Sequence, residues 1–399
     1  FQRRHSMSDR TISGKAAIVG IGATEFSKKS GRSEMRLAVE AVLAACADAG
    51  IAPAEVDGIS TYTMDNNPEM EVHRLIGGKA LKMFSRIDYG GGAACGPLLQ
   101  AAMAISTGIC ECVLVYRAMN ERSEYRFGTG VADRGADPTH ETAAFGWHSP
   151  HGLITPASWV AMAASAYLDK YDATTLDLGR VSVGGRSMAV NNPNAWFYQK
   201  PITLADHQNS RWICEPLRLL DCCQESDGAV ACLVVSAERA KDLRQKPAYI
   251  RGAAQGSCDD QQSMTSYYRD DVTRLTECAL VAEQLYRQAG VGPNDIQTAV
   301  IYDHFTPYVL MQLEEYGFCG RGEAKDFVRG GEHLMSGTLP INTHGGQLGE
   351  AYIHGMNGVA EGVRQIRGQS VNQVDNVKHV VVTAGTGVPT SGLLLGAEN

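Results

Sequence analysis

The 399-residue chain lacks the features that mark membrane, nucleic-acid-binding and zinc-binding proteins. It has no apolar run of about 18 residues and no signal-peptide core, so neither a membrane span nor secretion is expected. Its net charge of −8 comes from interspersed charges of both signs, which give no basic surface for nucleic acid or an anionic membrane. The eleven cysteines form no paired CxxC motifs, so we expect no metal site. A reducing cytoplasm is the expected location.

What is present is the composition of an ordinary globular protein. At the usual ~100–200 residues per domain, this length predicts two domains or one duplicated domain. Residues 1–6, which precede Met7, resemble the remnant of a cleaved tag and are not expected to join the fold.

The stretch 298–306 is the clearest candidate for part of a functional site. Its apolar residues lead directly into Tyr302, Asp303 and His304, after which a helical pattern begins. A continuous apolar run is typical of a strand covered on both faces, and ligands of open α/β sheets bind beyond the carboxyl ends of the strands. We therefore expect these three polar residues to face a pocket.

The first part of the chain alternates between strand and helix patterns. Ser33 is a suitable N-cap and Gly50 a suitable C-terminal residue for a helix between them. The glycine turn after the first strand is predicted to be a tight turn, because no acidic residue stands where a dinucleotide site needs one. The predicted strands are 16–22, 56–62, 84–88 and 112–116, and the predicted helices are 35–49, 69–76 and 98–107.

Three consecutive glycines, Gly90 to Gly92, form an elbow between a predicted strand and the next helix. Such an elbow can hold a nucleophile or bring a substrate close to backbone N–H groups. The elbow carries no side chain of its own. Cys95 follows near the start of the helix, where the helix dipole lowers a thiol pKa. The sequence leaves Cys95 as either a nucleophile or a small buried thiol.

Residues 117–216 show little regular periodicity beyond one amphipathic helix at 158–170. A segment this long is too large for a simple connection, so we predict an inserted subdomain that covers the pocket. Strand patterns return at 217–223 and 227–235.

The second half of the chain repeats the first. The pattern Ala-Gly-Ile-x-Pro-x-Glu-Val-Asp at 49–57 recurs as Ala-Gly-Val-x-Pro-x-Asp-Ile-Gln at 289–297, with a helix before and a strand after each copy. The offset places Tyr62 at the position equivalent to Tyr302. We therefore predict two matched βαβ halves, with 59–63 and 300–302 as equivalent central strands.

Together these features resemble the thiolase superfamily, in the branch of sterol-carrier-type thiolases and lipid-transfer proteins. The resemblance covers essentially the whole chain and includes the Pro-Leu-Arg-Leu-Leu-Asp-Cys-Cys run that begins at Pro216. It implies an α/β thiolase fold with duplicated βαβαβ halves, a five-layer αβαβα arrangement and an inserted loop domain. The implied N-terminal half comprises 7–116 and 217–245, the loop domain 117–216 and the C-terminal half 246–399.

The chain departs from this family at its reactive positions. The family carries a nucleophilic Cys at the glycine elbow, and spacing places that position at Gly91 or Gly92. Its His-Asp-Cys-Phe motif reads Tyr-Asp-His-Phe here, so Tyr302 replaces the histidine. Its Gly-His-Pro motif lies within 345–355, where Tyr352 replaces the histidine. Acyl transfer without a nucleophile would lose its covalent intermediate, whereas two phenols can still exchange protons.

Aldolases that remove the last part of a sterol side chain as an acyl-CoA belong to this branch, and the chain looks like one of them. The implied reaction is retro-aldol cleavage of a β-hydroxyacyl-CoA, a 17-hydroxysteroid with a short carboxyl-CoA side chain. Its products are a 17-ketosteroid and a short acyl-CoA such as propionyl-CoA. No cofactor is expected, because CoA is part of the substrate. The resemblance also implies a homodimer and a complex with a small OB-fold/zinc-ribbon protein, such as a hydratase subunit.

Site residues are expected at the family's motif positions. The catalytic candidates are Tyr302, Tyr352, His304 and His354. The substrate-binding candidates are Gly91, Gly92, His344, Gly345 and Gly346. Two other functions remain open at this point: a degradative thiolase that uses Cys95, and a non-catalytic carrier of acyl-CoA or lipid.

Overall fold

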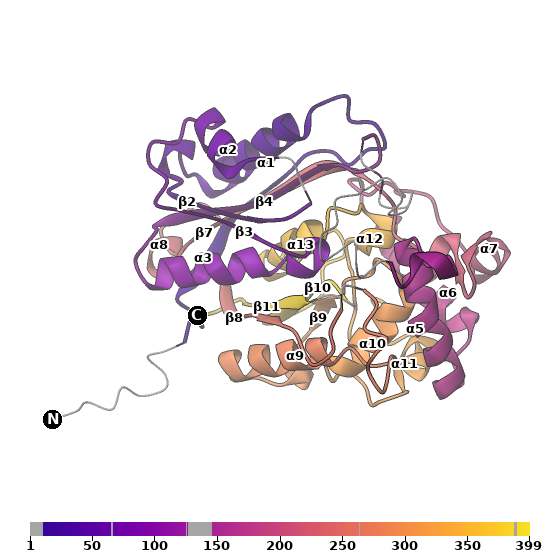
Figure 1. The fold of residues 1–399 in the computed structure, drawn as a ribbon. Coiled ribbons are helices and arrows are strands. Elements are labelled where there is room, and N and C mark those ends of the chain that lie inside the picture. The colour runs from indigo at the N-terminus through magenta and orange to yellow at the C-terminus, as the bar shows by residue number, and fades with distance from the viewer. Residues whose placement is uncertain (1–10, 65–66, 125, 127–145, 263, 387–388) are drawn as a thin grey trace.

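The computed structural model describes residues 11–64, 67–124, 126, 146–262, 264–386 and 389–399 (Figure 1). The predicted tag remnant lies outside these residues. Within them, the strands form one mixed sheet of nine strands and a separate two-stranded ribbon, β5-β6. The strands are β1 (Ala16–Ala23), β2 (Gly58–Tyr62), β3 (Met83–Ile87), β4 (Cys112–Asn120), β5 (Trp212–Cys214), β6 (Leu217–Arg218), β7 (Asp227–Ser236), β8 (Ala248–Gly256), β9 (Thr298–Val300), β10 (His379–Ala384) and β11 (Thr390–Gly396).

Helices cover the sheet and fill the space between its two halves. They are α1 (Glu34–Ala49), α2 (Glu69–Leu75), α3 (Gly96–Ser106), α5 (Pro156–Tyr171), α6 (Thr175–Ala189), α7 (Leu204–Asn209), α8 (Ala237–Ala240), α9 (Thr276–Ala289), α10 (Thr306–Glu315), α11 (Ala324–Gly330), α12 (Gly346–Gly349) and α13 (Met356–Arg367). Most predicted elements of the first part of the chain agree with these bounds to within one or two residues.

The large sheet consists of two similar halves that meet where β1 pairs with β8. Outward from this junction, the order β1-β7-β4-β2 on one side matches β8-β11-β10-β9 on the other. The directions also match, because within each of these four-strand sets only the outer pair is parallel, β2·β4 on one side and β9·β10 on the other. The N-terminal half has β3 beyond β2, whereas only an isolated bridge between Ala299 and Ile341 stands beyond β9. The predicted duplication of an α/β half is confirmed.

The repeated nonapeptide has the same local structure in both copies. Gly50 after α1 and Gly290 after α9 both adopt the left-handed conformation, with φ of 72° and 69°. Glu55 and Asp295 each accept a hydrogen bond from the backbone N–H three residues earlier, at 2.9 and 2.8 Å. Ser33 caps the amino end of α1 as predicted. Each copy thus ends a helix, turns, and leads into an equivalent strand.

The layers follow from three hydrophobic clusters. The first lies between α1 and the outer face of the N-terminal half-sheet. The second lies between the two half-sheets and is filled by α3 and α13. The third packs α9, α10 and part of α5 and α6 against the C-terminal half-sheet. Figure 1 shows these layers, with α1 and α2 at the top and α9 at the bottom. The predicted αβαβα arrangement is confirmed.

Two parts of the fold differ from the sequence-based expectations. In the segment 117–216, the predicted helix at 158–170 is confirmed as part of α5, but α6 and α7 were not predicted. The second expectation placed 300–302 in a central strand. In the structure β9 ends at Val300 and, among the described residues, stands at the edge of the sheet. Tyr302 consequently lies beyond the strand end, where a site is expected.

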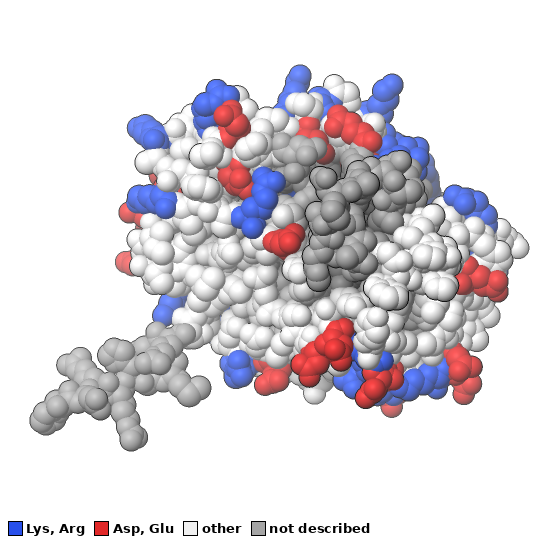
Figure 2. Space-filling view, viewed as in Figure 1, with Lys and Arg blue, Asp and Glu red and all other residues white. Residues whose placement is uncertain are grey.

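The surface in view mixes acidic and basic side chains rather than separating them by sign (Figure 2). In the part of the chain that the structure describes, no helix combines the length and the apolar character that crossing a membrane requires.

Candidate active site

Tyr302 and Tyr352 converge at the carboxyl end of the C-terminal half-sheet. Tyr302 follows β9, and Tyr352 lies between α12 and α13. Their hydroxyl oxygens are 3.2 Å apart, and both side chains are buried. Backbone hydrogen bonds fix both residues, because the N–H of Tyr302 donates to Thr383 Oγ1 and that of Tyr352 donates to Ser226 Oγ. The two predicted catalytic phenols are therefore brought together.

Both phenols are held in their neutral form. Burial raises the pKa of Tyr302 and of Tyr352 well above the ordinary value. Besides burial, the main influences on these two pKa values are neighbouring phenols, the Cys223 thiol and Glu121, and no cation is among them. A phenolate base stabilised by a nearby positive charge is therefore not what this geometry provides. The pair instead forms a hydrogen-bonded chain of two neutral O–H groups.

The glycine elbow packs directly against Tyr302. Gly90–Ala93 forms a 3-10 turn, and an ideal Cβ on Gly91 would lie 1.9 Å from the Tyr302 hydroxyl oxygen. The N–H groups of Gly90 and Gly92 are already used, by Thr63 Oγ1 and by the Tyr89 carbonyl. The expected backbone donors at these two glycines are thus engaged within the fold. Because it has no side chain, Gly91 instead leaves room for the Tyr302 phenol.

His304 lies against the same pair. Its ring meets that of Tyr302 edge-on, with 4.9 Å between ring centres. Burial lowers the pKa of His304 to about 3, so the imidazole is neutral near neutral pH. Its Nδ1 atom is buried without a hydrogen-bond partner in the described structure. A neutral ring in this position can donate or accept one hydrogen bond but cannot supply a positive charge.

His354 also lies against Tyr352, with the two rings edge-on and 5.0 Å between ring centres. The side chain is 2% exposed, and its backbone carbonyl accepts a hydrogen bond from the Tyr62 hydroxyl at 2.9 Å. Tyr62 is the residue that the repeat places in the position of Tyr302. The N-terminal half thus supports the site through its own tyrosine.

The structure places the three predicted substrate-binding residues after β9 next to Asp303 and α6: His344, Gly345 and Gly346. An ideal Cβ on Gly345 would clash with Ala189 of α6, and one on Gly346 would lie 2.0 Å from Asp303 Oδ2. His344 and Asp303 line a cavity of about 10 Å³, enough for roughly one water molecule. The structure therefore gives the two glycines a packing role.

A cluster of polar residues near the two phenols was not predicted from the sequence. Glu121 follows β4 and is 3% exposed, and its Oε2 has no hydrogen-bond partner among the described residues. Burial, followed by the charge of Glu225, raises the pKa of Glu121 well above the ordinary value. Burial also lowers the pKa of Lys28 to about 8. The sequence predicted that β4 ends at residue 116, whereas it ends at Asn120. With the correct end, Glu121 would have been a candidate for the same reason as Tyr302, because it is a polar residue that follows a buried strand.

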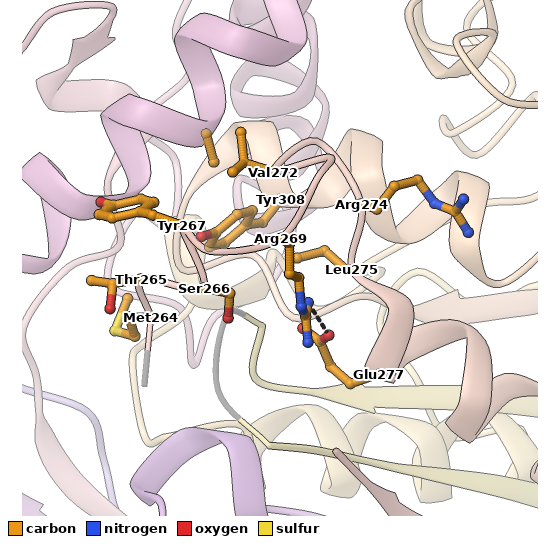
Figure 3. A pocket seen from close by; sticks show the side chains of 11 residues that line it. Met264, Thr265, Ser266, Tyr267, Arg269, Val272, Arg274, Leu275, Glu277 and Tyr308 are labelled. Atoms are coloured by element: carbon orange, nitrogen blue, oxygen red, sulfur yellow. Dashed lines mark hydrogen bonds and ion pairs between the residues drawn. The ribbon is translucent and has the colours of Figure 1, made fainter. Parts of the chain in front are cut away.

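A cavity of about 20 Å³ opens beside Tyr308 (Figure 3). The ring centre of Tyr308 is 5.4 Å from that of His304. Arg269 pairs with Glu277 at 2.7 Å in its wall. One further nitrogen of Arg269 and one further oxygen of Glu277 are buried without partners in the described structure. A spare donor beside a spare acceptor suits a hydroxyl or amide group.

Cys95 is far from reactive. It is fully buried, and its thiol faces the carbonyl of Val382 at 3.7 Å in the core between the half-sheets. Burial raises the pKa of the Cys95 thiol. The thiolate that a thiolase needs is therefore disfavoured, which argues against the thiolase alternative. Within the described residues, no group of His, Cys, Asp and Glu side chains is arranged to hold a metal ion.

Comparison with known proteins places this geometry in a family. Residues 258–394 match the family model "Thiolase C-terminal domain-like". The chain is 63% identical over 387 residues to the steroid side-chain-cleaving aldolase of Thermomonospora curvata, covering 97% of this chain and 99% of that one. It is 62% identical over 388 residues to the 17-hydroxy-3-oxo-4-pregnene-20-carboxyl-CoA lyase of Mycobacterium tuberculosis, covering 96% of this chain and all of that one.

A solved structure, the Ltp2-ChsH2(DUF35) aldolase, is also similar. It superimposes with a TM-score of 0.93 at 62% identity, covering 98% of this chain and 99% of that one. These matches extend over both halves of the duplicated fold. The chain belongs to the thiolase superfamily, in the family of steroid side-chain-cleaving aldolases.

Proposed function

We propose that the protein is a carbon–carbon lyase that cleaves a 17-hydroxysteroid carrying a short carboxyl-CoA side chain. The products are a 17-ketosteroid and a short acyl-CoA such as propionyl-CoA. The observation that carries this proposal is the pair of phenol oxygens 3.2 Å apart at the place where a thiolase nucleophile would stand. The names of the two similar enzymes support the substrate class.

The reaction moves one proton from oxygen to carbon. One phenol oxygen accepts the proton of the substrate's tertiary hydroxyl as the bond between the carbinol carbon and the α-carbon breaks. The electron pair of that bond passes into the thioester to form an enolate, and the carbinol carbon becomes a ketone. In the same concerted step, the first phenol passes its own proton across the hydrogen bond to the second phenol, and the second phenol gives its proton to the α-carbon. Neither phenol carries two protons or none at any point, so both end neutral.

This relay explains why the phenols need no lowered pKa. Each tyrosine gains one proton and loses another, so neither has to persist as a phenolate in a buried site. The high pKa of Glu121 also fits, because a neutral carboxyl does not repel the developing enolate. The neutral imidazoles of His304 and His354 are suitable donors to the enolate oxygen.

The test is cleavage in the absence of free CoA. A retro-aldol reaction consumes no thiol, so purified protein with its partner subunit should release the 17-ketosteroid and the acyl-CoA in equal amounts from substrate alone. A thiolase would release product only when CoA is added. A carrier would bind the thioester and release neither product. Dependence on added CoA, or binding without turnover, would refute the proposal.

We further propose that the chain binds a small OB-fold/zinc-ribbon subunit of the DUF35 type. The name of the similar structure, Ltp2-ChsH2(DUF35) aldolase, supports such a partner. Co-expression with a DUF35 subunit should give one complex that survives size-exclusion chromatography. Separate elution at micromolar concentrations would count against the partner.

A homodimer is also proposed, through the edge strand β3. Within the described residues this strand ends the sheet, and its Phe84 is 56% exposed. An edge strand offers unpaired backbone groups to a second copy. Light scattering should give twice the chain mass, and Phe84→Glu should shift the protein toward one chain mass. A wild-type protein of single chain mass would contradict the dimer.

A further inference from the structure

Arg117 is a guanidinium buried inside the site. It lies in β4 and is completely inaccessible to solvent. Its Nη1 donates to the carbonyl oxygens of Tyr62 and Thr63, each at 2.7 Å, and its Nη2 donates to that of Met64 at 3.1 Å. Burying a charge costs several kcal/mol unless hydrogen bonds compensate it. Arg117 is thus held in one orientation by the backbone that follows β2.

The same guanidinium contacts His354. Nη2 of Arg117 lies 2.5 Å from Nδ1 of His354. A guanidinium has only donors, so Nδ1 must be the acceptor in this contact. The single proton of the neutral imidazole therefore resides on Nε2. The contact also excludes an imidazolium, because a protonated Nδ1 would point its proton at another N–H group.

The groups around His354 also favour its neutral form. The titratable and charged groups facing it are Arg117 from β4, Tyr62 from β2, Tyr352 from its own segment and His304 after β9. Burial, followed by the charges of Arg117 and His304, holds the pKa of His354 well below its ordinary value.

The backbone at His354 is itself unusual. Its φ is +47°, a conformation that costs a residue with a side chain about 1–3 kcal/mol and persists where the surroundings enforce it. Its ring lies beside Tyr352 and near the glycine elbow, since an ideal Cβ on Gly90 would be 3.7 Å from His354 Cε1. The imidazole therefore faces the space between the elbow and the phenol pair.

We propose that Arg117 is a positioning residue that fixes His354 as a neutral imidazole with its proton on Nε2, so that His354 donates a hydrogen bond to the thioester enolate oxygen. This inference rests on the proposed retro-aldol reaction and adds a role to it. His354 is then a fixed donor and not a general base. A neutral imidazole donor is well matched to an enolate, because it stabilises the charge without giving up its proton.

The tautomer can be measured without any substrate. The wild-type protein is labelled with ¹⁵N-histidine, and the His354 signal is identified by its absence in His354→Gln. We expect a protonated Nε2 and an unprotonated Nδ1, with no titration between about pH 5 and 8, where an ordinary histidine titrates. A protonated Nδ1, or an imidazolium forming in that range, would overturn the proposal.

Variants test the catalytic consequence. Arg117→Met should lower kcat by about 10²–10³-fold, the usual loss for one oxyanion donor, with little change in KM, and the proton of His354 should no longer be confined to Nε2. Arg117→Lys keeps a cationic donor and should retain more activity. His354→Gln keeps an N–H donor and should retain more activity than His354→Leu. The matched control is Arg287→Lys on the surface of α9, which should leave kcat unchanged.

The outcomes separate this inference from the proposed function. An unchanged kcat in a folded Arg117→Met protein, or equal losses in His354→Gln and His354→Leu, would refute the donor role. If Arg117→Met does not fold, the tautomer of wild-type His354 and the comparison of His354→Gln with His354→Leu still test the proposal. Absence of cleavage by the wild-type complex would refute the proposed function, while the tautomer measurement would remain valid for Arg117 and His354.

Discussion

At the scale of single residues, Tyr302 and a side chain at position 91 exclude each other. The Tyr302 hydroxyl oxygen lies 1.9 Å from where a Cβ on Gly91 would stand, far inside van der Waals contact. A cysteine nucleophile at Gly91 therefore requires a different residue, or a different rotamer, at position 302. The absence of a nucleophile at position 91 and the presence of a phenol at position 302 therefore depend on each other sterically.

Gly91→Cys should consequently abolish cleavage without creating a thiolase. The new Cβ displaces the Tyr302 hydroxyl, so we expect cleavage to fall by ~10²–10⁴, the range for loss of a positioned acid or base. Gly91→Ala is the matched control, because it has the same steric effect without a thiol and should lose as much. The measurements are propionyl-CoA release and acetyl transfer to CoA. Appreciable acetyl transfer by Gly91→Cys would show that the tyrosines matter less than the elbow.

Cys95→Ala should behave in the opposite way. Removing a small buried thiol should lower the free energy of unfolding by about 1 kcal/mol, as for a typical core substitution. Most of the cleavage activity should remain, because the sulfur faces Val382 and not the phenols. Denaturant unfolding and steady-state kinetics check the two effects separately. Loss of activity in a folded Cys95→Ala protein would return the thiolase alternative to consideration.

Much of the candidate site could be predicted because strand ends can be located in a sequence. Tyr302 and His304 follow an apolar run, and the family motifs point to Tyr352. Arg117 and Glu121 could not be predicted in the same way. Their strand was expected to end at 116, and a charged residue within a strand gives no sign that it will be buried. Only the fold reveals that Arg117 faces His354.

At the scale of elements, the two halves should respond alike to matched substitutions. Gly50→Ala and Gly290→Ala each place a side chain in a left-handed conformation at the end of equivalent helices. Neither new Cβ meets an atom closer than 3.7 Å. Each variant should therefore lose about 1–2 kcal/mol of unfolding free energy, from backbone conformation alone. Denaturant unfolding of each variant measures this loss of unfolding free energy. A loss in only one of the two variants would contradict the equivalence of the two halves.

The elements that the sequence analysis missed lie where packing overrides local propensity. α6 contains Gly179, Gly184 and Gly185, which lower helix propensity and mask its periodicity. In the structure, an ideal Cβ on Gly179 would lie 2.9 Å from His207, and one on Gly184 would lie 2.6 Å from His333. These glycines allow neighbouring segments to pack closely against the helix. The repeat at 49–57 and 289–297, by contrast, could be predicted because its glycine, proline and acidic residues form the turn locally.

At the scale of the whole molecule, one buried carboxyl couples stability to pH. Burial raises the pKa of Asp303 from 3.8 to about 6. Below about pH 4 the carboxyl is protonated in both states and has no effect on stability. Between about pH 4 and 6 the unfolded chain releases the proton and the folded protein keeps it, so stability falls as pH rises. The loss is complete above pH 6 and amounts to roughly 3 kcal/mol at 1.36 kcal/mol per pKa unit.

Asp303→Asn should remove this dependence. The amide oxygen can still accept the hydrogen bond from the Gln347 N–H, which Asp303 Oδ1 accepts at 2.7 Å. The difference in unfolding free energy between variant and wild type should therefore shift in favour of the variant as pH rises from 4 to 6. Denaturant titrations at several pH values measure that difference. A difference that stays constant over this range would contradict the raised pKa of Asp303.

In the proposed reaction, the whole fold serves to bring two neutral phenols together so that one proton moves from oxygen to carbon. The most direct measurement is kcat for steroid-CoA cleavage in Tyr302→Phe, Tyr352→Phe and the double variant, with folding and partner binding verified for each. Each single variant should lose ~10²–10⁴ in kcat. The double variant should lose little more kcat than either single variant, because the same proton relay is broken in each of the three proteins. Near-wild-type cleavage by both single variants would contradict the relay and the function built on it.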